Sequence, residues 1–218
     1  MNKHLLVTAG PTREMLDPVR FLSNVSTGEM GYQVAREAKK KGYRVVLVSG
    51  PTALTPPAGV HFVPVVSTQE MERAVKHYFP KCDALIMTAA VCDYTPARPH
   101  AQKIKRIRQK TVLFKRTNDI LKSISSRKGK RIVIGFCLET ENLRKNARRK
   151  LREKRLNYIA ANIYNKSQNP FGKNAASILL IDEFLREQIF PKAGKTELAR
   201  KLITVLDREL KNHLKVKR

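Results

Sequence analysis

The chain has 218 residues and a formal net charge of +26, because 44 Lys and Arg outnumber 18 Asp and Glu. Its length suits one domain spanning residues 1–218, and its 42% hydrophobic content is typical of a globular protein. No apolar run approaches the ~20 residues that cross a bilayer, and the start of the chain lacks a signal-peptide pattern. The sequence therefore predicts a cytoplasmic protein with no membrane partner.

The positive charge attracts nucleotides, phosphorylated metabolites and nucleic acid alike, so it does not select among them. Nonspecific binding of nucleic acid is expected from such a charge and says little about function. Cys82, Cys92 and Cys137 form no Cys-x-x-Cys pair and no metal-binding spacing. That usage favours packed thiols in a reducing compartment.

The first two thirds of the chain alternate short apolar segments with amphipathic ones, as βαβ units do. Strands are predicted at residues 5–9, 44–49, 60–66, 84–89, 132–136 and 158–161. Helices are predicted at residues 28–41, 68–78, 119–126 and 141–155. This order predicts a Rossmann-like α/β fold, with an open, mostly parallel sheet and helices on both faces.

Later segments break the alternation. No acid lies between Asp93 and Asp119, and the basic, β-branched segment at residues 103–115 predicts an exposed strand or hairpin. Residues 178–181 and 188–190 predict two late strands, the last a candidate antiparallel one. A helix is predicted at residues 196–213 with Thr196 as its N-cap, followed by a frayed tail at 214–218.

Small and polar residues follow four of the predicted strands, in segments that begin at Gly10, Thr88, Gly135 and Ala161. Ligands of open parallel sheets bind outside the carboxyl ends of the strands. The first segment runs for about twenty residues before a helix begins, and loops of that length are usually functional. The helix start after Ser26 and Thr27 fits an anion site, and close helix packing is the alternative. Neither a dinucleotide fingerprint nor a P-loop is present.

Several charged residues have more than one interpretation. Lys103 is either one solvated lysine among many or the cation of a flexible flap over a phosphate. Lys150 and Lys154 are spaced i, i+4, so they lie on one helix face. Asp17 and Asp93 could bind a metal, orient a ribose or cap backbone, and capping is the commoner role of a loop Asp.

Eight motifs run in order over about residues 5–185. They are Thr8-Ala9-Gly10-x-Thr12-Arg13-Glu14, Asp17-Pro18-Val19-Arg20, Ser23-Asn24-x-Ser26-x-Gly28-x-Met30-Gly31, Val48-Ser49-Gly50-Pro51, Ala89-Ala90-Val91-x-Asp93-Tyr94, Lys103-Ile104-Lys105, Gly135-Phe136-x-x-Glu139-Thr140 and Ala161-Asn162. Together they resemble the phosphopantothenoylcysteine synthetase family of coenzyme A biosynthesis. The chain resembles the stand-alone form, without a flavin-dependent decarboxylase domain.

The resemblance implies a ligase that joins 4′-phosphopantothenate and L-cysteine. The phosphopantothenate carboxylate attacks the α-phosphate of CTP or ATP, which releases pyrophosphate and leaves an acyl nucleotidylate. The amine of cysteine then attacks the acyl carbon. The resemblance also implies Mg²⁺ as cofactor, with its ligands left open, a homodimer, and a separate phosphopantothenoylcysteine decarboxylase as a candidate partner.

The same resemblance implies roles for particular residues. Asn24 and Lys103 are the candidate catalytic residues, Asn24 holding the acyl nucleotidylate and Lys103 neutralising the triphosphate from a flap. The candidate substrate-binding residues are Asn24, Arg20, Ala90 and Asn162. The candidate nucleotide-binding residues are Gly10, Ser26, Gly28, Ala89, Asp93, Lys103, Asp119, Phe136, Lys150 and Lys154. Residues 103–117 would form a basic flap and dimerisation arm.

Two alternatives stay open. The alternation of strands and helices also suits an NAD(P)-dependent oxidoreductase, although Ser49-Gly50-Pro51 stands where the acidic residue that binds ribose is expected. The charge also suits a nucleic-acid-binding module, although aromatic residues are only 6% of the chain and no Trp is present to stack on bases.

Overall fold

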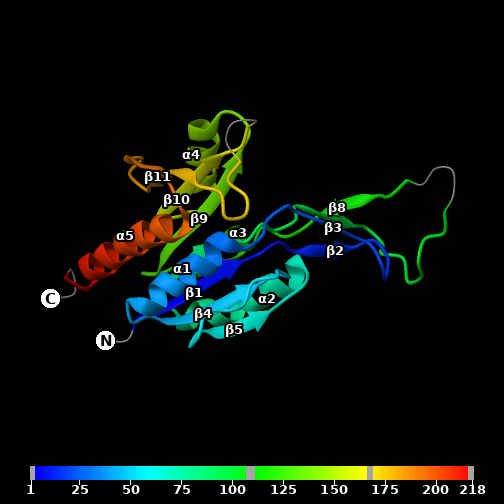
Figure 1. Ribbon diagram of the computed structural model, residues 1–218, viewed down its shortest axis with the longest axis horizontal. Helices are drawn as coiled ribbons and strands as arrows, with labels where there is room; N and C mark the ends of the chain where they lie inside the picture. Colours follow the sequence, from blue (N-terminus) through cyan, green and yellow to red (C-terminus); the bar gives the residue numbers. More distant parts are fainter. Residues whose placement is uncertain (1–2, 107–110, 166–168, 216–218) are drawn as a thin grey trace.

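The computed structural model describes residues 3–106, 111–165 and 169–215 (Figure 1). Its elements in chain order are β1 (His4–Ala9), β2 (Arg13–Met15), β3 (Phe21–Ser23), α1 (Glu29–Lys40), β4 (Arg44–Ser49), β5 (His61–Pro64), α2 (Thr68–Tyr78), η1 (Phe79–Lys81), β6 (Ala84–Met87), β7 (Tyr94–Pro96), β8 (Phe114–Arg116), α3 (Ile120–Ile124), η2 (Ser125–Arg127), β9 (Ile132–Glu139), α4 (Leu143–Glu153), β10 (Tyr158–Ile163), β11 (Ala176–Asp182), β12 (Glu187–Ala193) and α5 (Lys195–Lys215).

The central sheet has eight strands in the order β12-β11-β10-β9-β6-β1-β4-β5. The six strands from β10 to β5 pair in parallel, and β11 and β12 are antiparallel additions at one edge. The parallel strands have the doubly wound order. From β1 the chain adds β4 and β5 on one side and then β6, β9 and β10 on the other, so the switch point lies between β1 and β6. The predicted Rossmann-like sheet is therefore confirmed, and both pairings made by the late strands, β10 with β11 and β11 with β12, are antiparallel.

Helices cover both faces of this sheet because successive residues of each strand point to opposite sides. Leu5 and Val7 of β1 pack with α1 and α5, whereas Leu6 packs on the opposite face with α2, α3 and α4. Helix α1 approaches β1 closely at Gly31, where an added Cβ would lie 2.5 Å from the Cβ of Ala9. Strands buried on both faces explain why the sequence reads as continuous apolar runs.

Most predicted elements are found with small changes of boundary, and β4 and α2 have the predicted ends. The N-cap predicted at Thr196 is wrong. Helix α5 begins at Lys195, and the carbonyl of Gly194 accepts the first helical bond from Leu198 N at 3.1 Å. The hydroxyl of Thr196 instead donates to Gln33 Oε1 of α1 at 3.2 Å.

The predicted frayed tail is only partly tested. Helix α5 extends to Lys215, two residues into the stretch 214–218. The remainder of the tail lies outside the described residues. Within the part of the chain that the structure describes, no helix is long and apolar enough to cross a membrane.

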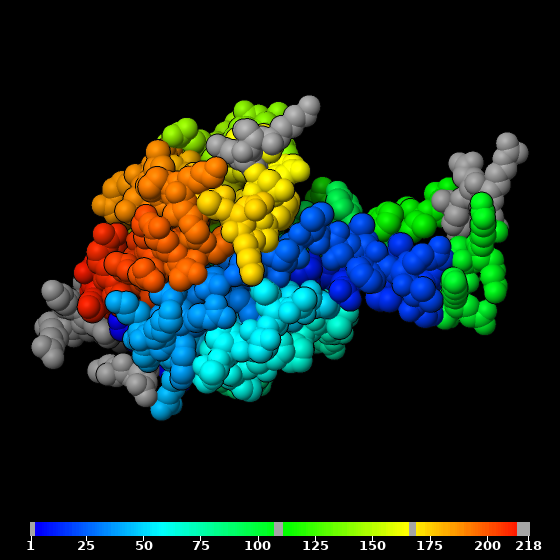
Figure 2. All heavy atoms as spheres, viewed as in Figure 1, coloured from blue at the N-terminus to red at the C-terminus, as the bar shows by residue number. Residues whose placement is uncertain are grey.

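An arm extends from the carboxyl end of the sheet, and Figure 2 shows it as a narrow projection from the body. It contains the hairpin β2–β3 and the paired strands β7 and β8. The hairpin β2–β3 was predicted as a loop, because its strands have only three residues each and show no apolar alternation. Of the predicted basic strand or hairpin at 103–115, the described residues place Phe114–Arg116 in a strand, and residues 107–110 lie outside them.

Candidate active site

The site lies where the sheet changes direction, at the carboxyl ends of β1 and β6. Pro11 and Ala90, which follow these strands, form an isolated parallel bridge. The amide of Ala90 donates to the carbonyl of Gly10 at 3.0 Å, and the amide of Thr12 donates to the carbonyl of Ala90 at 3.2 Å. The long segment after β1 therefore starts against the segment after β6, as expected for a ligand crevice in this fold.

Asn24 returns to the same point from the base of the arm. Its side-chain amide nitrogen donates to the carbonyl of Ala90 at 2.9 Å and lies 3.9 Å from Cys92 Sγ. The hydroxyl of Ser23 donates to the carbonyl of Thr12 at 2.7 Å, which fixes the residue before Asn24. The hairpin β2–β3 thus brings together Asn24 and Ala90, two residues predicted to bind the same substrate.

A first cavity, of about 570 Å³, opens beside Asn24. Its lining combines hydroxyl groups with apolar side chains, and includes Ser23, Ser26, Thr27, Thr52, Phe21, Val25, Leu54 and Lys173. Gly28 precedes α1 with φ of +81°, a conformation that favours glycine. A Cβ on Gly28 would lie 3.2 Å from the Cα of Gly10. Three residues that were predicted to bind the nucleotide, Gly10, Ser26 and Gly28, are therefore neighbours at the start of α1.

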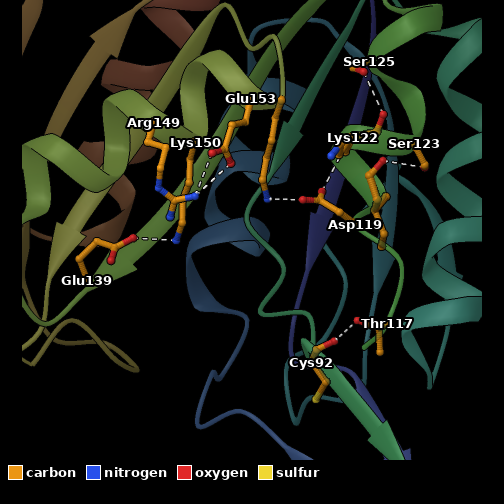
Figure 3. Close-up of polar contacts among 12 residues, drawn as sticks. Cys92, Thr117, Asp119, Lys122, Ser123, Ser125, Glu139, Arg149, Lys150 and Glu153 are labelled. Atoms are coloured by element: carbon orange, nitrogen blue, oxygen red, sulfur yellow. Dashed lines mark hydrogen bonds and ion pairs between the residues drawn. The ribbon is translucent and has the colours of Figure 1, made fainter. Parts of the chain in front are cut away.

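A second cavity, of about 470 Å³, is lined by half of the residues predicted to bind the nucleotide. Residues from four separate segments line it, namely Ala89, Asp93, Asp119, Phe136 and Lys154. Lys154 Nζ lies 3.0 Å from Asp119 Oδ2, and the other oxygen of Asp119 accepts from the amide of Lys122 at the start of α3. Figure 3 shows Asp119 at this position between the two elements. Arg116 and Lys122 also line the cavity, so its cations outnumber its two carboxylates.

Lys150 does not join Lys154 in this cavity, although both belong to one face of the α4 segment. Its Nζ lies 2.7 Å from Glu139 Oε1 at the end of β9, as Figure 3 shows. Asn146 donates to the other carboxylate oxygen of Glu139 at 2.9 Å. Asn162 lies at the end of β10, where its backbone is in register with Leu138 of β9. The roles predicted for Lys150 and Asn162 stay predictions.

Lys103 and Arg20 lie on the arm rather than in either cavity. Residues 100–106 form the far end of the arm in Figures 1 and 2, and Lys103 is exposed there. The Arg20 guanidinium contacts Asp17 and donates to the carbonyl of Ile104 at 2.9 Å. The hydrogen bond from Arg20 holds the pKa of the Asp17 carboxyl well below its usual range, with further help from backbone donors. The structure of one chain therefore does not bring Lys103 to Asn24.

All three cysteines are free and buried, as the packing interpretation predicted. Burial raises the pKa of the Cys92 thiol, and it raises the pKa values of Cys82 and Cys137 to about 11. Among the described residues, no three His, Cys, Asp or Glu side chains gather closely enough to hold a metal ion.

Sequence reasoning missed Thr12 and Thr52. The Thr12 hydroxyl is fully buried, accepts from the amide of Cys92 at 2.9 Å and lies 3.0 Å from the hydroxyl of Thr68. Thr52 lines the first cavity and is the nearest neighbour of Gly28. Thr52 directly follows the motif that ends in Gly50-Pro51, and the end of β4 lies at the same sheet edge as the site. That position was the signal that could have identified it.

Comparison with known proteins gives the family. Residues 1–210 match the DNA/pantothenate metabolism flavoprotein C-terminal domain. The chain belongs to this family. The match agrees with the resemblance found in the sequence motifs.

Named relatives support this assignment. The chain is similar to the coenzyme A biosynthesis bifunctional protein CoaBC of Bacillus subtilis, 43% identical over 85% of the chain and 47% of that protein. It is 41% identical to CoaBC of Escherichia coli over 73% of the chain and 41% of that protein. The chain thus spans about half the length of the curated relatives that it matches.

Solved structures confirm the fold. The C-terminal domain of a CoaBC superposes with a TM-score of 0.83 at 39% identity, covering 97% of this chain and 99% of that domain. A Cab2 variant solved with phosphopantothenate-cysteine has a TM-score of 0.78 at 15% identity, covering 97% and 88%. The second likeness concerns the fold alone.

Proposed function

We propose that this protein is a phosphopantothenate–cysteine ligase of coenzyme A biosynthesis. One observation carries the proposal: residues from four distant segments, each predicted to bind a nucleotide, line one cavity next to the Asn24–Ala90 pair. Ala89 and Val91, on either side of Ala90, both line that cavity. Asn24 therefore stands at the edge of a nucleotide site, where an acyl group bonded to the α-phosphate would lie.

The two cavities suit the two larger substrates. The triphosphate of CTP or ATP would occupy the cavity of Asp119 and Lys154, which carries a surplus of cations. Phosphopantothenate would occupy the cavity beside Asn24, because its hydroxyl and apolar lining matches a substrate with both phosphate and branched aliphatic parts. This proposal would move Ser26, which was predicted to bind the nucleotide, to the phosphopantothenate site. L-cysteine would enter as the last substrate, after the acyl nucleotidylate has formed.

The chemistry we propose relies on positioning and charge stabilisation. The carboxylate of phosphopantothenate attacks the α-phosphate and pyrophosphate leaves; the cysteine amine then displaces the nucleoside monophosphate. Asn24 would orient the acyl nucleotidylate through its side-chain amide, and Lys103 would stabilise negative charge that develops at the phosphates. Arg20 stays a predicted contact of the substrate phosphate. No protein nucleophile is needed for either step.

The cofactor we propose is Mg²⁺, which would neutralise charge on the nucleotide phosphates. Of the two carboxylates that line the second cavity, Asp119 contacts Lys154 and the amide of Lys122, so Asp93 is the carboxylate that would meet such an ion. Sites of this kind hold Mg²⁺ through one or two carboxylates together with substrate phosphates.

We propose a homodimer joined through the arm. The arm exposes large apolar side chains at 37–75% of their surface, and these are Met15, Phe21, Leu22, Tyr94, Leu113 and Phe114. Exposed apolar patches of this kind mark protein interfaces. Since Lys103 lies at the far end of the arm, the arm of one subunit would supply it to the site of the other. A cytoplasmic location and a separate decarboxylase as partner stay predictions.

The test is a reconstitution with matched omissions. Purified protein, phosphopantothenate, Mg²⁺ and CTP or ATP should release pyrophosphate, and mass spectrometry without cysteine should detect the acyl nucleotidylate. Adding cysteine should convert it to phosphopantothenoylcysteine. The Asn24→Asp variant, which changes only the side-chain amide, should lose product formation. Pyrophosphate released equally well without phosphopantothenate would contradict the proposal.

The two alternatives gain no support from a particular observation. A nicotinamide site in this fold needs a tight glycine turn between the first strand and helix. Here residues 10–28 separate β1 from α1 and include a hairpin. Charge alone explains nonspecific binding of nucleic acid.

A further inference from the structure

Asp17 is a buried carboxylate in an otherwise exposed part of the arm. Only 1% of its surface is accessible, whereas Val19 and Phe21 nearby expose 58% and 41%. A buried carboxylate is retained only where donors compensate for its lost hydration. Asp17 lies in the turn of the hairpin β2–β3. The groups that bury its carboxylate must therefore come from this turn and from the segment packed against it.

Five donor contacts surround the Asp17 carboxylate. Oδ1 accepts from the amides of Val19 at 2.8 Å and Arg20 at 2.9 Å. Oδ2 accepts from Nε of Arg20 at 2.9 Å, from a terminal nitrogen of the same guanidinium, and from the amide of Ile104 at 3.1 Å. Four of these contacts close the turn itself. The fifth joins it to a residue 87 positions later in the chain.

Ile104 is held on both of its backbone polar groups. Its amide donates to Asp17, and its carbonyl accepts from the Arg20 guanidinium at 2.9 Å. The amide of His100 also donates to the carbonyl of Leu16 at 2.9 Å. Residues 100–104 are therefore tied to the hairpin turn at two points, and Lys103 lies between them.

A second Asp–Arg pair shows what is special about this one. Asp182, 7% exposed, accepts from the amides of Phe184 and Arg186 and from Nε of Arg186, at 2.6–3.0 Å. These contacts close the turn between β11 and β12, within residues 182–186. Asp17 likewise accepts from two backbone amides and from Nε of Arg20 within its turn. In addition, Asp17 and Arg20 hydrogen-bond to the backbone of Ile104.

We propose that Asp17 is a positioning residue for Lys103, acting through Arg20 and the backbone of Ile104. This proposal rests on the ligase function proposed above, in which Lys103 contacts the nucleotide phosphates. The ionised carboxylate holds the Arg20 guanidinium in the plane where it can reach the Ile104 carbonyl. Loss of this charge would break the hydrogen bonds of Asp17 and Arg20 to the Ile104 backbone, so that the segment carrying Lys103 would no longer be fixed to the hairpin turn.

The first experiment measures the tether without any substrate. Amide hydrogen exchange, followed by mass spectrometry of peptides covering residues 100–106, is compared for wild type, Asp17→Asn and the matched control Asp182→Asn. Exchange of this segment should be at least tenfold faster in Asp17→Asn and unchanged in Asp182→Asn. Equal exchange in wild type and Asp17→Asn overturns the proposal.

The second experiment separates positioning from a general structural role. Asp17→Asn should lower kcat/KM for phosphopantothenate at least tenfold, whereas the matched control Asp182→Asn should leave kcat/KM unchanged. In a Lys103→Gln background, Asp17→Asn should lower kcat/KM less than threefold, because the effects of two residues that act through one group are not additive. An equal factor in both backgrounds overturns the proposal. Absence of ligation by wild type refutes the proposed function instead, and the exchange result then still decides whether Asp17 holds Ile104.

Discussion

Strand β1 of the central sheet is buried on both faces, whereas the strands of the arm have three residues each and expose large apolar side chains. The body contains both hydrophobic clusters of the molecule's described core. The arm depends instead on polar ties, such as the carboxylate of Asp17 and the buried hydroxyl of Thr12. In the function proposed above, the body supplies stability and the nucleotide cavity, while the arm supplies Lys103 and the subunit contact.

This contrast indicates which property each substitution should alter. Changes in the body should alter the free energy of unfolding, because core side chains carry most of the apolar burial. Changes in the arm should alter catalysis or association while the fold of the body persists. Asn24 stands at the junction, since it leaves the arm at the end of β3 and bonds to Ala90 of the body.

Stability should respond most strongly, and a matched pair of leucines tests this. Leu5→Ala should lower the free energy of unfolding by about 2–5 kcal/mol, because Leu5 is completely buried and a cavity remains. Leu113→Ala, in the arm, should change the free energy of unfolding by no more than about 0.5 kcal/mol in dilute protein, because Leu113 is 75% exposed. Urea unfolding followed by circular dichroism measures both. Equal losses would show that the arm is part of the cooperative core.

The next effect should appear in catalysis without a change in stability. Lys103→Gln should lower kcat by about 10²–10³, the usual cost of removing one group that stabilises transition-state charge. Lys105→Gln is the matched control, because both lysines are exposed and flank Ile104. Steady-state pyrophosphate release measures the two variants. A comparable loss in both would mean that the charge of the arm acts as a whole rather than through Lys103.

The body was predictable from sequence to a much greater extent than the arm. Strand β4 and helix α2 have the predicted boundaries because β4 is a continuous apolar run, α2 is amphipathic, and the ends of both carry clear signals. Helix α2, for example, begins after a capping box formed by Ser67 and Glu70. The convergence of Ala89 and Phe136 on one cavity was also predictable, since parallel strands place their carboxyl ends at one edge. Asp119, which precedes α3, was predicted to join them only through the family resemblance.

The arm depends on contacts that no local pattern encodes. Arg13 and Glu14 in β2 have no apolar alternation, so the hairpin looks like a loop in the sequence. The bond between Asp17 and Ile104 spans 87 residues, and nothing in either motif indicates the other. Lys150 illustrates the same limit in the body, because spacing placed it on the helix face but not against Glu139.

A smaller effect, on dimerisation, should show whether the proposed subunit interface lies on the arm or on the body. Leu113→Lys should weaken dimerisation at least tenfold, about 1.4 kcal/mol, because it places a charge in the apolar surface of the arm. Ile189→Lys is the control, since Ile189 is 64% exposed on the edge strand β12 of the body. Analytical ultracentrifugation over a concentration series measures both. Dissociation caused by Ile189→Lys instead would place the interface on the sheet edge.

The smallest effect concerns a charge within the body. Glu37 of α1 is buried and lies 2.7 Å from Lys40 and 3.2 Å from Arg200 of α5. The hydrogen bond from Lys40, aided by Arg200, lowers the pKa of the Glu37 carboxyl despite its burial. Because both cations are more than half exposed, Glu37→Gln should cost only about 0.5–1 kcal/mol at pH 7.

The pH dependence of that cost follows from the direction of the shift. A carboxyl whose pKa is lower in the folded state stabilises the fold above its unfolded pKa of about 4.3, and this stabilisation is lost as the pH falls through the folded value. Urea unfolding at pH 7 and pH 3 should therefore show the gap between wild type and Glu37→Gln narrowing in acid. Glu197→Gln, which removes an exposed pair with Lys201, is the control and should cost less at pH 7. A gap that is constant with pH would assign the cost to side-chain packing between α1 and α5 rather than to charge.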